Sequence, residues 1–198
     1  GTVLGLLWSY LKPGVQFLVY YFVMGIVLQL HRDIEHFPVY LFAGIILVNF
    51  FNEAFGNATN AIVENRALVR KIYLPRELFP VAAVIVALIH FVPQAAILLV
   101  VCLLVGWVPS IASLAIALAA VVLLASFALG LGMIFGAINV RFRDAQNVVE
   151  ILRMVSVWSA PTMYTWEMVH TALPEWLFFT YFSNPIAIGV EMFHEAFW

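Results

Sequence analysis

Residues 58–77 read ATNAIVENRALVRKIYLPRE and separate two long apolar runs, residues 37–55 and 78–105. This stretch holds the largest group of basic residues in the chain, which has nine Lys and Arg in all. Cytoplasmic loops of membrane proteins collect Lys and Arg, so basic clusters between apolar runs report both the spans and their direction. The distribution predicts a polytopic membrane protein whose residues 58–77 lie in the cytoplasm. The other clusters follow the same pattern, with only Arg32 elsewhere: Lys12, then Arg141, Arg143 and Arg153.

The composition agrees with a chain that faces lipid. Hydrophobic residues make up 65% and charged residues 10%, with a mean hydropathy of +1.03, whereas soluble domains carry roughly 45–50% apolar and about 25% charged residues. The basic residues are spread over separate loops, which argues against a nucleic-acid partner. A single cysteine, Cys102, excludes a disulfide within the chain and a cysteine zinc site, and its apolar surroundings predict a packed or lipid-facing thiol.

A bilayer core of about 30 Å needs about 20 apolar residues in a helix. Runs of this length predict an all-α fold with a single transmembrane domain over residues 1–198. Basic clusters on the inside place residues 31–36 and 106–110 outside, together with the chain after Met154, which has no Lys or Arg. Because the chain then starts inside and finishes outside, we expect the full protein to continue beyond both ends of this sequence. Five transmembrane helices are expected here, at about residues 13–30, 37–55, 78–105, 109–140 and 148–164.

Few polar side chains lie within the predicted spans, and each suggests a function. His90 is either a proton relay or substrate contact, or a neutral imidazole bonded to a neighbouring helix. The second is favoured because Glu53, placed near the end of its span, is not expected at the same depth. Arg153 is expected to reach cytoplasmic headgroups, or its helix to begin as an interfacial segment. Four asparagines predict a water-filled path or bonds to a neighbouring helix: Asn49, Asn52, Asn57 and Asn60.

Within the cytoplasmic stretch, residues 61–71 have apolar residues at rough helical spacing among basic ones. Such a short amphipathic helix can lie on the membrane surface, insert into a soluble partner, or serve only as a positive-inside anchor. The sequence lacks G-x-x-x-x-G-K-[ST], H-E-x-x-H and G-x-S-x-G, so it predicts no ATP site, no catalytic residue and no metal site of its own.

Residues 68–77, LVRKIYLPRE, resemble the L-V-[KR]-K-[VI]-Y-[FL]-P-R-E segment of a known family. That family comprises the permease subunits of type-2 ABC exporters of polysaccharides, of the O-antigen and teichoic-acid kind. Residues 7–13, LWSYLKP, and 139–144, NVRFRD, resemble further family elements in the same order. Pro161 with Tyr164 and the pair Asn184-Pro185 also resemble family elements, although Ala160 separates the serine and proline that the family has adjacent.

This resemblance implies the membrane subunit of an ATP-driven transporter that exports lipid-linked polysaccharide for the cell wall. The permease itself is not an enzyme: two copies of it work with two copies of a separate ATPase, which holds ATP and Mg. The resemblance also implies a multi-pass protein of the bacterial cytoplasmic membrane and a coupling helix at residues 61–71. Residues expected to couple to the ATPase are Arg66, Leu68, Val69, Arg70, Lys71, Tyr73, Arg76 and Glu77.

Aromatic side chains can hold a sliding sugar chain weakly, by its apolar faces, without trapping it. Such residues on the first and fifth spans are expected to line the pore or, alternatively, to serve only in packing: Phe17, Tyr20, Tyr21, Trp158 and Tyr164. The resemblance implies gate helices outside, at about residues 165–198, followed by a sixth span in the full chain. Gly132 and Gly136 predict a close helix approach, preferably within one subunit.

Two other classes of function remain open at this stage. A related ABC permease that exports drugs or lipids would share the same coupling stretch, although the aromatic first span is less expected there. A membrane-embedded enzyme or an ion-coupled carrier is disfavoured because acidic residues are scarce within the predicted spans.

Overall fold

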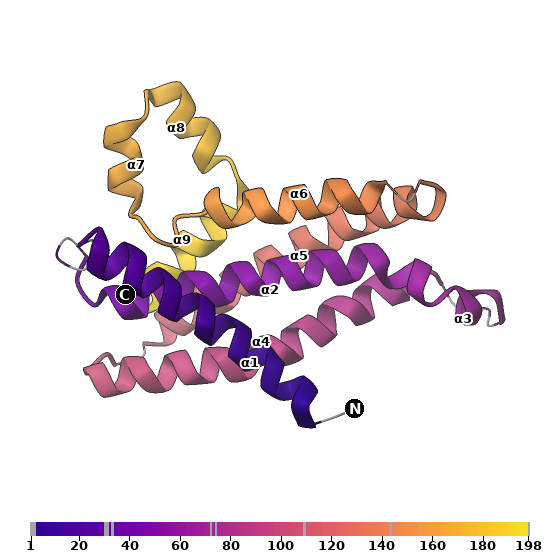
Figure 1. Ribbon diagram of the computed structural model, residues 1–198, viewed down its shortest axis with the longest axis horizontal. Helices are drawn as coiled ribbons and strands as arrows, with labels where there is room; N and C mark the ends of the chain where they lie inside the picture. Colours follow the sequence, from indigo (N-terminus) through magenta and orange to yellow (C-terminus); the bar gives the residue numbers. More distant parts are fainter. Residues whose placement is uncertain are drawn as a thin grey trace.

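The computed structural model describes residues 3–29, 32, 34–71, 73, 75–108, 110–142 and 144–197. The side chains of residues 3–10 and of Arg70 lie outside this description. The described residues form helices joined by short connections, with no strand among them (Figure 1). The elements are α1 (Val3–Tyr20), the π-helix η1 (Tyr21–Val27), α2 (Phe37–Glu64), α3 (Arg66–Lys71), α4 (Leu78–Val105), α5 (Ile111–Arg141), α6 (Ala145–Trp158), α7 (Trp166–Ala172), α8 (Glu175–Phe182) and α9 (Pro185–Phe197).

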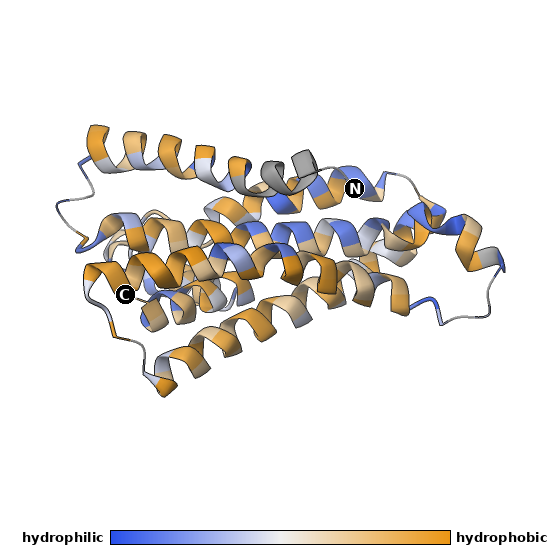
Figure 2. Cartoon of the chain, turned by 90° about the horizontal axis from the view of Figure 1, so that it is seen from below, coloured by the Kyte–Doolittle hydropathy of each residue, from blue (hydrophilic) through white to orange (hydrophobic). Residues whose placement is uncertain are grey.

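The helix α2 forms the centre of the bundle. It packs against α1, α4, α5, α6 and α9, and 83% of its most apolar stretch is buried, against 28% in α4 and 17% in α5. The outer faces of α4 and α5 are therefore free to contact lipid. A helix face in contact with lipid must carry apolar side chains, because the bilayer core offers no water to polar groups. Figure 2 shows the consequence, since the outer helices are mostly hydrophobic whereas hydrophilic segments interrupt α2.

Among the residues that the structure describes, three helices are long and apolar enough to cross a membrane: α2, α4 and α5, with a shorter apolar helix over Leu11–Val27. The observed helices differ from the predicted spans mainly at their ends. The first helix begins at Val3 rather than at Pro13, which lies within it. The second continues past residue 55 to Glu64. The helix α6 has only 14 residues, fewer than the roughly 20 that a span requires. The number of spans therefore stays a prediction.

The two ends of the bundle match the predicted sidedness. Residues 34–36 and the α4–α5 connection lie at one end, and α3 with the start of α4 lies at the other (Figure 1). The basic stretch and the predicted outer loops are thus separated by the full length of the bundle. Leu30, His31, Asp33 and Pro109, which belong to predicted span ends or outer loops, lie outside the described residues.

The small residues of α5 allow its close approach to α2. Ala128, Gly132 and Gly136 are buried along one face of α5. A Cβ at Gly132 would overlap the Cβ of Ala58, and a Cβ at Gly136 would lie 3.3 Å from the Thr59 carbonyl oxygen. The prediction that this glycine pair packs within one subunit is therefore confirmed, since both partners lie on α2 of the same chain.

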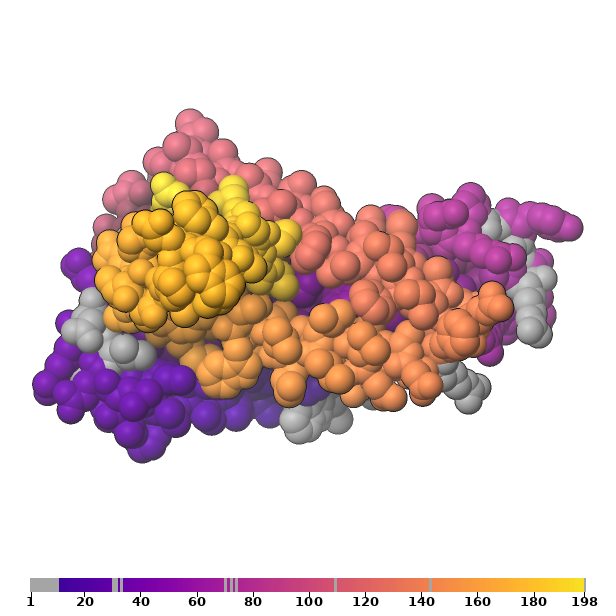
Figure 3. Space-filling model, turned by 90° about the horizontal axis from the view of Figure 1, so that it is seen from above, coloured from indigo at the N-terminus to yellow at the C-terminus, as the bar shows by residue number. Residues whose placement is uncertain are grey.

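The chain after α6 folds into two parts. Residues 159–165 are not helical, so the helix ends before residue 164, the predicted end of the fifth span. The short helices α7 and α8 rise from one end of the molecule, as the gold lobe of Figure 3 shows. In contrast, α9 returns to pack against α5 and α2. Its C-terminal end covers Cys102, whose Sγ lies 3.9 Å from the Phe197 carbonyl oxygen, so the thiol is packed rather than lipid-facing.

The close approach of α5 to α2 gives a matched test. The substitution Gly132→Ala forces a methyl group against Ala58, whereas Gly130→Ala meets no atom within 4 Å. Both changes add the same helix propensity, so the difference between them isolates the overlap. We expect the free energy of unfolding of Gly132→Ala to be about 1–3 kcal/mol lower than that of Gly130→Ala. Denaturation in detergent measures both values. Adding Ala58→Gly should restore most of the loss, and equal stability of the two single variants would contradict the packing.

Candidate functional site

The predicted coupling stretch begins as the last turn of α2. The backbone N–H of Asn65 donates to the Ala61 carbonyl at 3.3 Å, and its side-chain Nδ2 donates to the same oxygen at 2.7 Å. The Asn65 carbonyl then accepts from the N–H groups of Leu68 and Val69, both at 2.9 Å, which starts α3. The expected single helix over residues 61–71 is thus divided, because Asn65 ends one helix and redirects the chain into the next.

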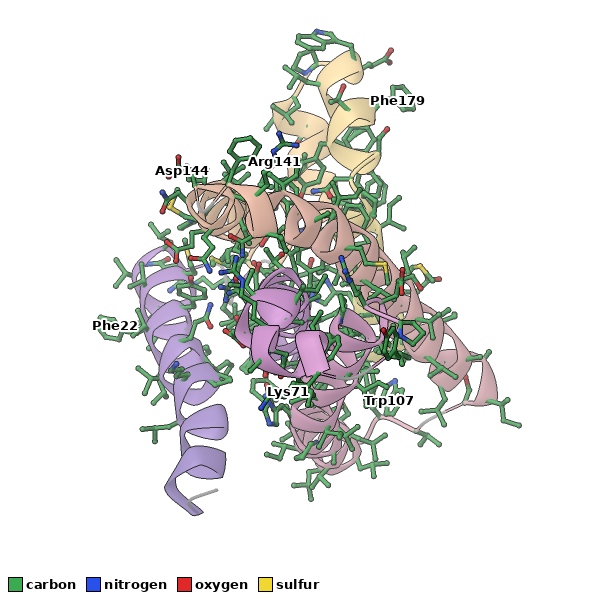
Figure 4. All side chains as sticks on the ribbon, turned by 90° about the vertical axis from the view of Figure 1, so that its right-hand side faces the viewer. Phe22, Lys71, Trp107, Arg141, Asp144 and Phe179 are labelled. Carbon is green, nitrogen blue, oxygen red and sulfur yellow. The ribbon has the colours of Figure 1, made fainter. Side chains whose placement is uncertain are left out.

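Most of the described side chains of α3 and of the residues after it are exposed to solvent. Leu68 is 43% exposed and Tyr73 is fully exposed, so apolar surface is presented at a polar end of the bundle. Figure 4 looks onto this end, with Lys71 in front of the helices. The expected coupling residues Arg66, Lys71, Arg76 and Glu77 are exposed, and Val69 is half-buried. The Arg70 side chain, Ile72 and Leu74 lie outside the described residues, as do the side chains of residues 7–10 and Arg143.

The aromatic residues of the first helix pack against α2. Phe17 stacks on Tyr21 with ring centroids 5.9 Å apart and meets Phe42 edge-on at 5.7 Å. Tyr21 stacks on Phe37 at 6.3 Å, and Tyr20 joins the same cluster. Within one chain these three predicted pore residues therefore help to hold α1 on α2. Their role in lining a pore stays a prediction.

The two other aromatic candidates lie where α6 ends. Trp158 is 57% exposed, while Tyr164 is half-buried and donates its hydroxyl hydrogen to the Trp158 carbonyl at 2.7 Å. The Tyr181 hydroxyl lies 3.1 Å from that of Tyr164. Burial raises the pKa of Tyr181, so it stays protonated. Because Tyr164 already donates its hydrogen to Trp158, Tyr181 is the donor between the two hydroxyls.

The segment that follows α6 is tied to the central helix through Tyr40. Its hydroxyl donates to the carbonyl oxygens of Tyr164 at 2.9 Å and Pro161 at 3.3 Å. His194 of α9 stacks on the Tyr40 ring at 3.6 Å, and its Nε2 donates to the Tyr40 carbonyl at 2.9 Å. Asn184 adds a bond to the Ser159 hydroxyl at 3.1 Å. The residues quoted for the family resemblance in this region are thus brought together.

A polar cavity of about 470 Å³ lies between α1, α2, α4 and α6. Its walls carry four ionisable side chains, together with amides and a few apolar residues. The polar lining residues come from all four helices, so no single stretch of sequence contains the site. They are Lys12, Gln16, Asn49, Asn52, Glu53, Asn57, His90, Gln94 and Arg153.

Glu53 and His90 face each other across this cavity. The His90 Nδ1 lies 2.6 Å from the Glu53 carboxylate, and the two side chains are 29% and 35% exposed. The expectation that His90 has no acidic partner at its depth is therefore wrong. Glu53 was placed near the end of its span, but α2 continues to Glu64 and the antiparallel α4 brings His90 opposite it.

The asparagines of α2 divide between the two predicted roles. Asn52 accepts from the Ser156 hydroxyl of α6 at 2.8 Å, so it bonds a neighbouring helix. Asn49 lines the cavity, and its Nδ2 donates to the side-chain Oε1 of Gln16 on α1 at 2.9 Å. Asn57 also lines the cavity and is exposed. Near the cytoplasmic end, Asn60 accepts from Asn139 at 3.1 Å and from Gln146 at 2.8 Å.

Arg153 turns inward from α6 rather than toward the headgroups. Its guanidinium packs on the backbone of Gly56, where a Cβ would lie only 2.9 Å from Nη1. The Arg153 Nε is buried and has no hydrogen-bond partner among the described residues. The glycine is therefore required for this close approach. Sequence reasoning missed the contact because neither helix shows which of its faces meets the other.

The whole chain, residues 1–198, matches the family described as ABC-2 type transporter. The protein belongs to this family of membrane subunits, which confirms the resemblance read from the coupling stretch. One relative is the "O-antigen export system permease protein RfbA" of Myxococcus xanthus, 30% identical over 164 residues, which cover 83% of this chain and 62% of the relative. Two proteins of the same name from Klebsiella pneumoniae are 25% identical over 200 residues, covering 99% of this chain and 73% of each relative.

The pair of Glu53 and His90 predicts a measurable coupling between α2 and α4. In a double-mutant cycle, Glu53→Gln and His90→Gln should each lower the free energy of unfolding, because each removes the hydrogen-bond partner of the other side chain. We expect the double variant to lose less than the sum of the two losses, by about 1 kcal/mol. Denaturation in detergent measures all four proteins. Additive losses would contradict a direct interaction.

Proposed function

We propose that this chain is the membrane-spanning subunit of an ATP-driven exporter of lipid-linked polysaccharide in the bacterial cytoplasmic membrane. Two copies of it work with two copies of a separate ATPase, which binds ATP and Mg and supplies the energy. The observation that carries this proposal is the exposed α3 at the end of the central helix, in a chain of the ABC-2 family. The names of its relatives as O-antigen export permeases support the polysaccharide as the cargo.

The shape of α3 suits a docking element for a soluble partner. Leu68 and Tyr73 offer apolar contact surface, while Arg66 and Lys71 provide charges that fix orientation and partner choice. Only Asn65 separates α3 from α2. A movement of α3 driven by ATP binding would therefore act directly on the helix that contacts most of the bundle. Packed helices respond to such a force as nearly rigid bodies.

Charge reversal at Arg70 and Lys71 tests the coupling role. We expect the double variant to Glu to abolish export and the retention of the ATPase on the purified permease, because the electrostatic fit is inverted. Membrane insertion and the unfolding midpoint should stay unchanged, since Lys71 is exposed. Co-purification of the ATPase and an assay for polymer that accumulates in the cytoplasm measure the two effects.

A matched control is Arg141→Glu, which reverses an exposed charge at the same end of the bundle but on α5. The control should retain both the ATPase and export. Normal export by the Arg70 and Lys71 double variant would overturn the proposed coupling role of α3.

The aromatic residues of the first helix offer a second test. Replacing Tyr20 and Tyr21 by Ala should slow export several-fold while the permease still assembles as a dimer, if these rings guide the sugar chain. Phe22→Ala is the control, because this neighbour is 58% exposed and lies outside the α1–α2 aromatic cluster. Crosslinking reports assembly and the accumulation assay reports export. A loss of assembly in the double variant would support a role in packing alone.

A further inference from the structure

The cavity between α1, α2, α4 and α6 contains an arginine whose hydrogen bonds the protein does not complete. The Arg153 Nε is buried without a partner among the described residues, although its guanidinium is held against Gly56. A guanidinium carries five N–H donors and keeps its charge under all ordinary conditions. Arg153 as a whole is half-buried, but its Nε–H is cut off from water, and a buried donor of this kind is stabilised by a partner that accepts its hydrogen bond.

The charges around the cavity favour an anion as that partner. Its four ionisable lining residues are Lys12 on α1, Glu53 on α2, His90 on α4 and Arg153 on α6. The carboxylate of Glu53 is engaged by His90 at 2.6 Å. Lys12 and Arg153 form no ion pair with the described acidic residues. With Glu53 paired to His90, the cavity keeps two cationic side chains without an ion-pair partner among the described residues: the exposed Lys12 and the half-buried Arg153.

We propose that this cavity binds a phosphoryl group. Several phosphoryl oxygens can accept hydrogen bonds from different directions, and Lys12 and Arg153 approach from different helices. The exposed amide of Asn57 supplies a further donor, and the volume of about 470 Å³ suits a small ligand. Phe50 and Phe91 add an apolar wall, with ring centroids 5.1 Å apart, which suits a group attached to a lipid.

Phosphoryl groups reach this depth from three sources: the bilayer lipids, the lipid end of the cargo, or phosphate in solution. The chemistry of recognition is shared by all three. The inference rests on the proposed function only where the carrier lipid of the polysaccharide is taken as the source, and the site itself follows from the geometry of the cavity.

The test uses the full chain in nanodiscs of zwitterionic lipid, with a fluorescent long-chain alkyl phosphate as the probe. Arg153→Gln removes the charge and should weaken binding at least about tenfold. Gly56→Ala should also weaken binding, because its methyl group displaces the guanidinium. Gly130→Ala, which meets no atom within 4 Å, and Arg141→Gln, which is exposed and lies outside the cavity, should bind as the unchanged protein does.

Competition between the probe and unlabelled ligands then distinguishes the three sources of the phosphoryl group. Each of the three outcomes is compatible with the proposed site. Displacement of the probe by phosphatidylglycerol identifies bilayer lipid, displacement by inorganic phosphate identifies a soluble ligand, and displacement by neither identifies a lipid with a terminal phosphate. Equal affinity of Arg153→Gln, Gly56→Ala and the two control variants would overturn the proposal. So would loss of binding in Glu53→Gln with full binding in Arg153→Gln, because the anionic probe would then be held without the guanidinium.

This assay needs neither the ATPase nor export. A chain that binds the probe but retains no ATPase would refute the proposed function and leave the phosphoryl site standing. If the Arg153→Gln variant exports polymer normally and binds the probe as tightly as the unchanged protein, the phosphoryl site is refuted and the proposed function is not.

Discussion

The arrangement of this protein depends on a polar helix that is surrounded by other helices within the membrane. In lipid, each unsatisfied polar group costs several kcal/mol, so α2 can carry its asparagines and Glu53 only where neighbouring helices or a hydrated cavity provide partners. Asn52 bonds α6, Asn49 bonds α1 and Glu53 bonds α4. The most apolar helices, α4 and α5, are consequently the ones left facing lipid.

The same helix connects the two ends of the molecule. A helix of 28 residues is about 42 Å long, which exceeds the bilayer core of about 30 Å. Near its outer end, Tyr40 holds the segment around Pro161 and Tyr164, and at its inner end Asn65 leads into α3. A displacement at the α3 end can therefore reach the segment around Pro161 and Tyr164 through one rigid element and its hydrogen bonds.

Glycines allow the contacts that this arrangement requires. Gly132 lets α5 approach Ala58, Gly56 lets the Arg153 guanidinium reach the backbone of α2, and Gly189 of α9 lies where a Cβ would be 2.8 Å from Leu124. In each case a side chain would push two elements apart. Packing in the membrane relies on such close approaches because burial between helices adds little hydrophobic stabilisation there.

The sequence by itself determined the all-α class and the family, and it predicts the direction of the chain through the membrane and a cytoplasmic location for residues 58–77. These features depend on run length, charge placement and local motifs, which are properties of single segments. The tertiary structure alone decided that His90 meets Glu53, that Arg153 turns inward onto Gly56 and that α9 returns to cover Cys102. Such contacts depend on the rotation and register of one helix against another, and a shift of one residue along a helix turns its face by about 100°. No pattern within a single segment contains that information.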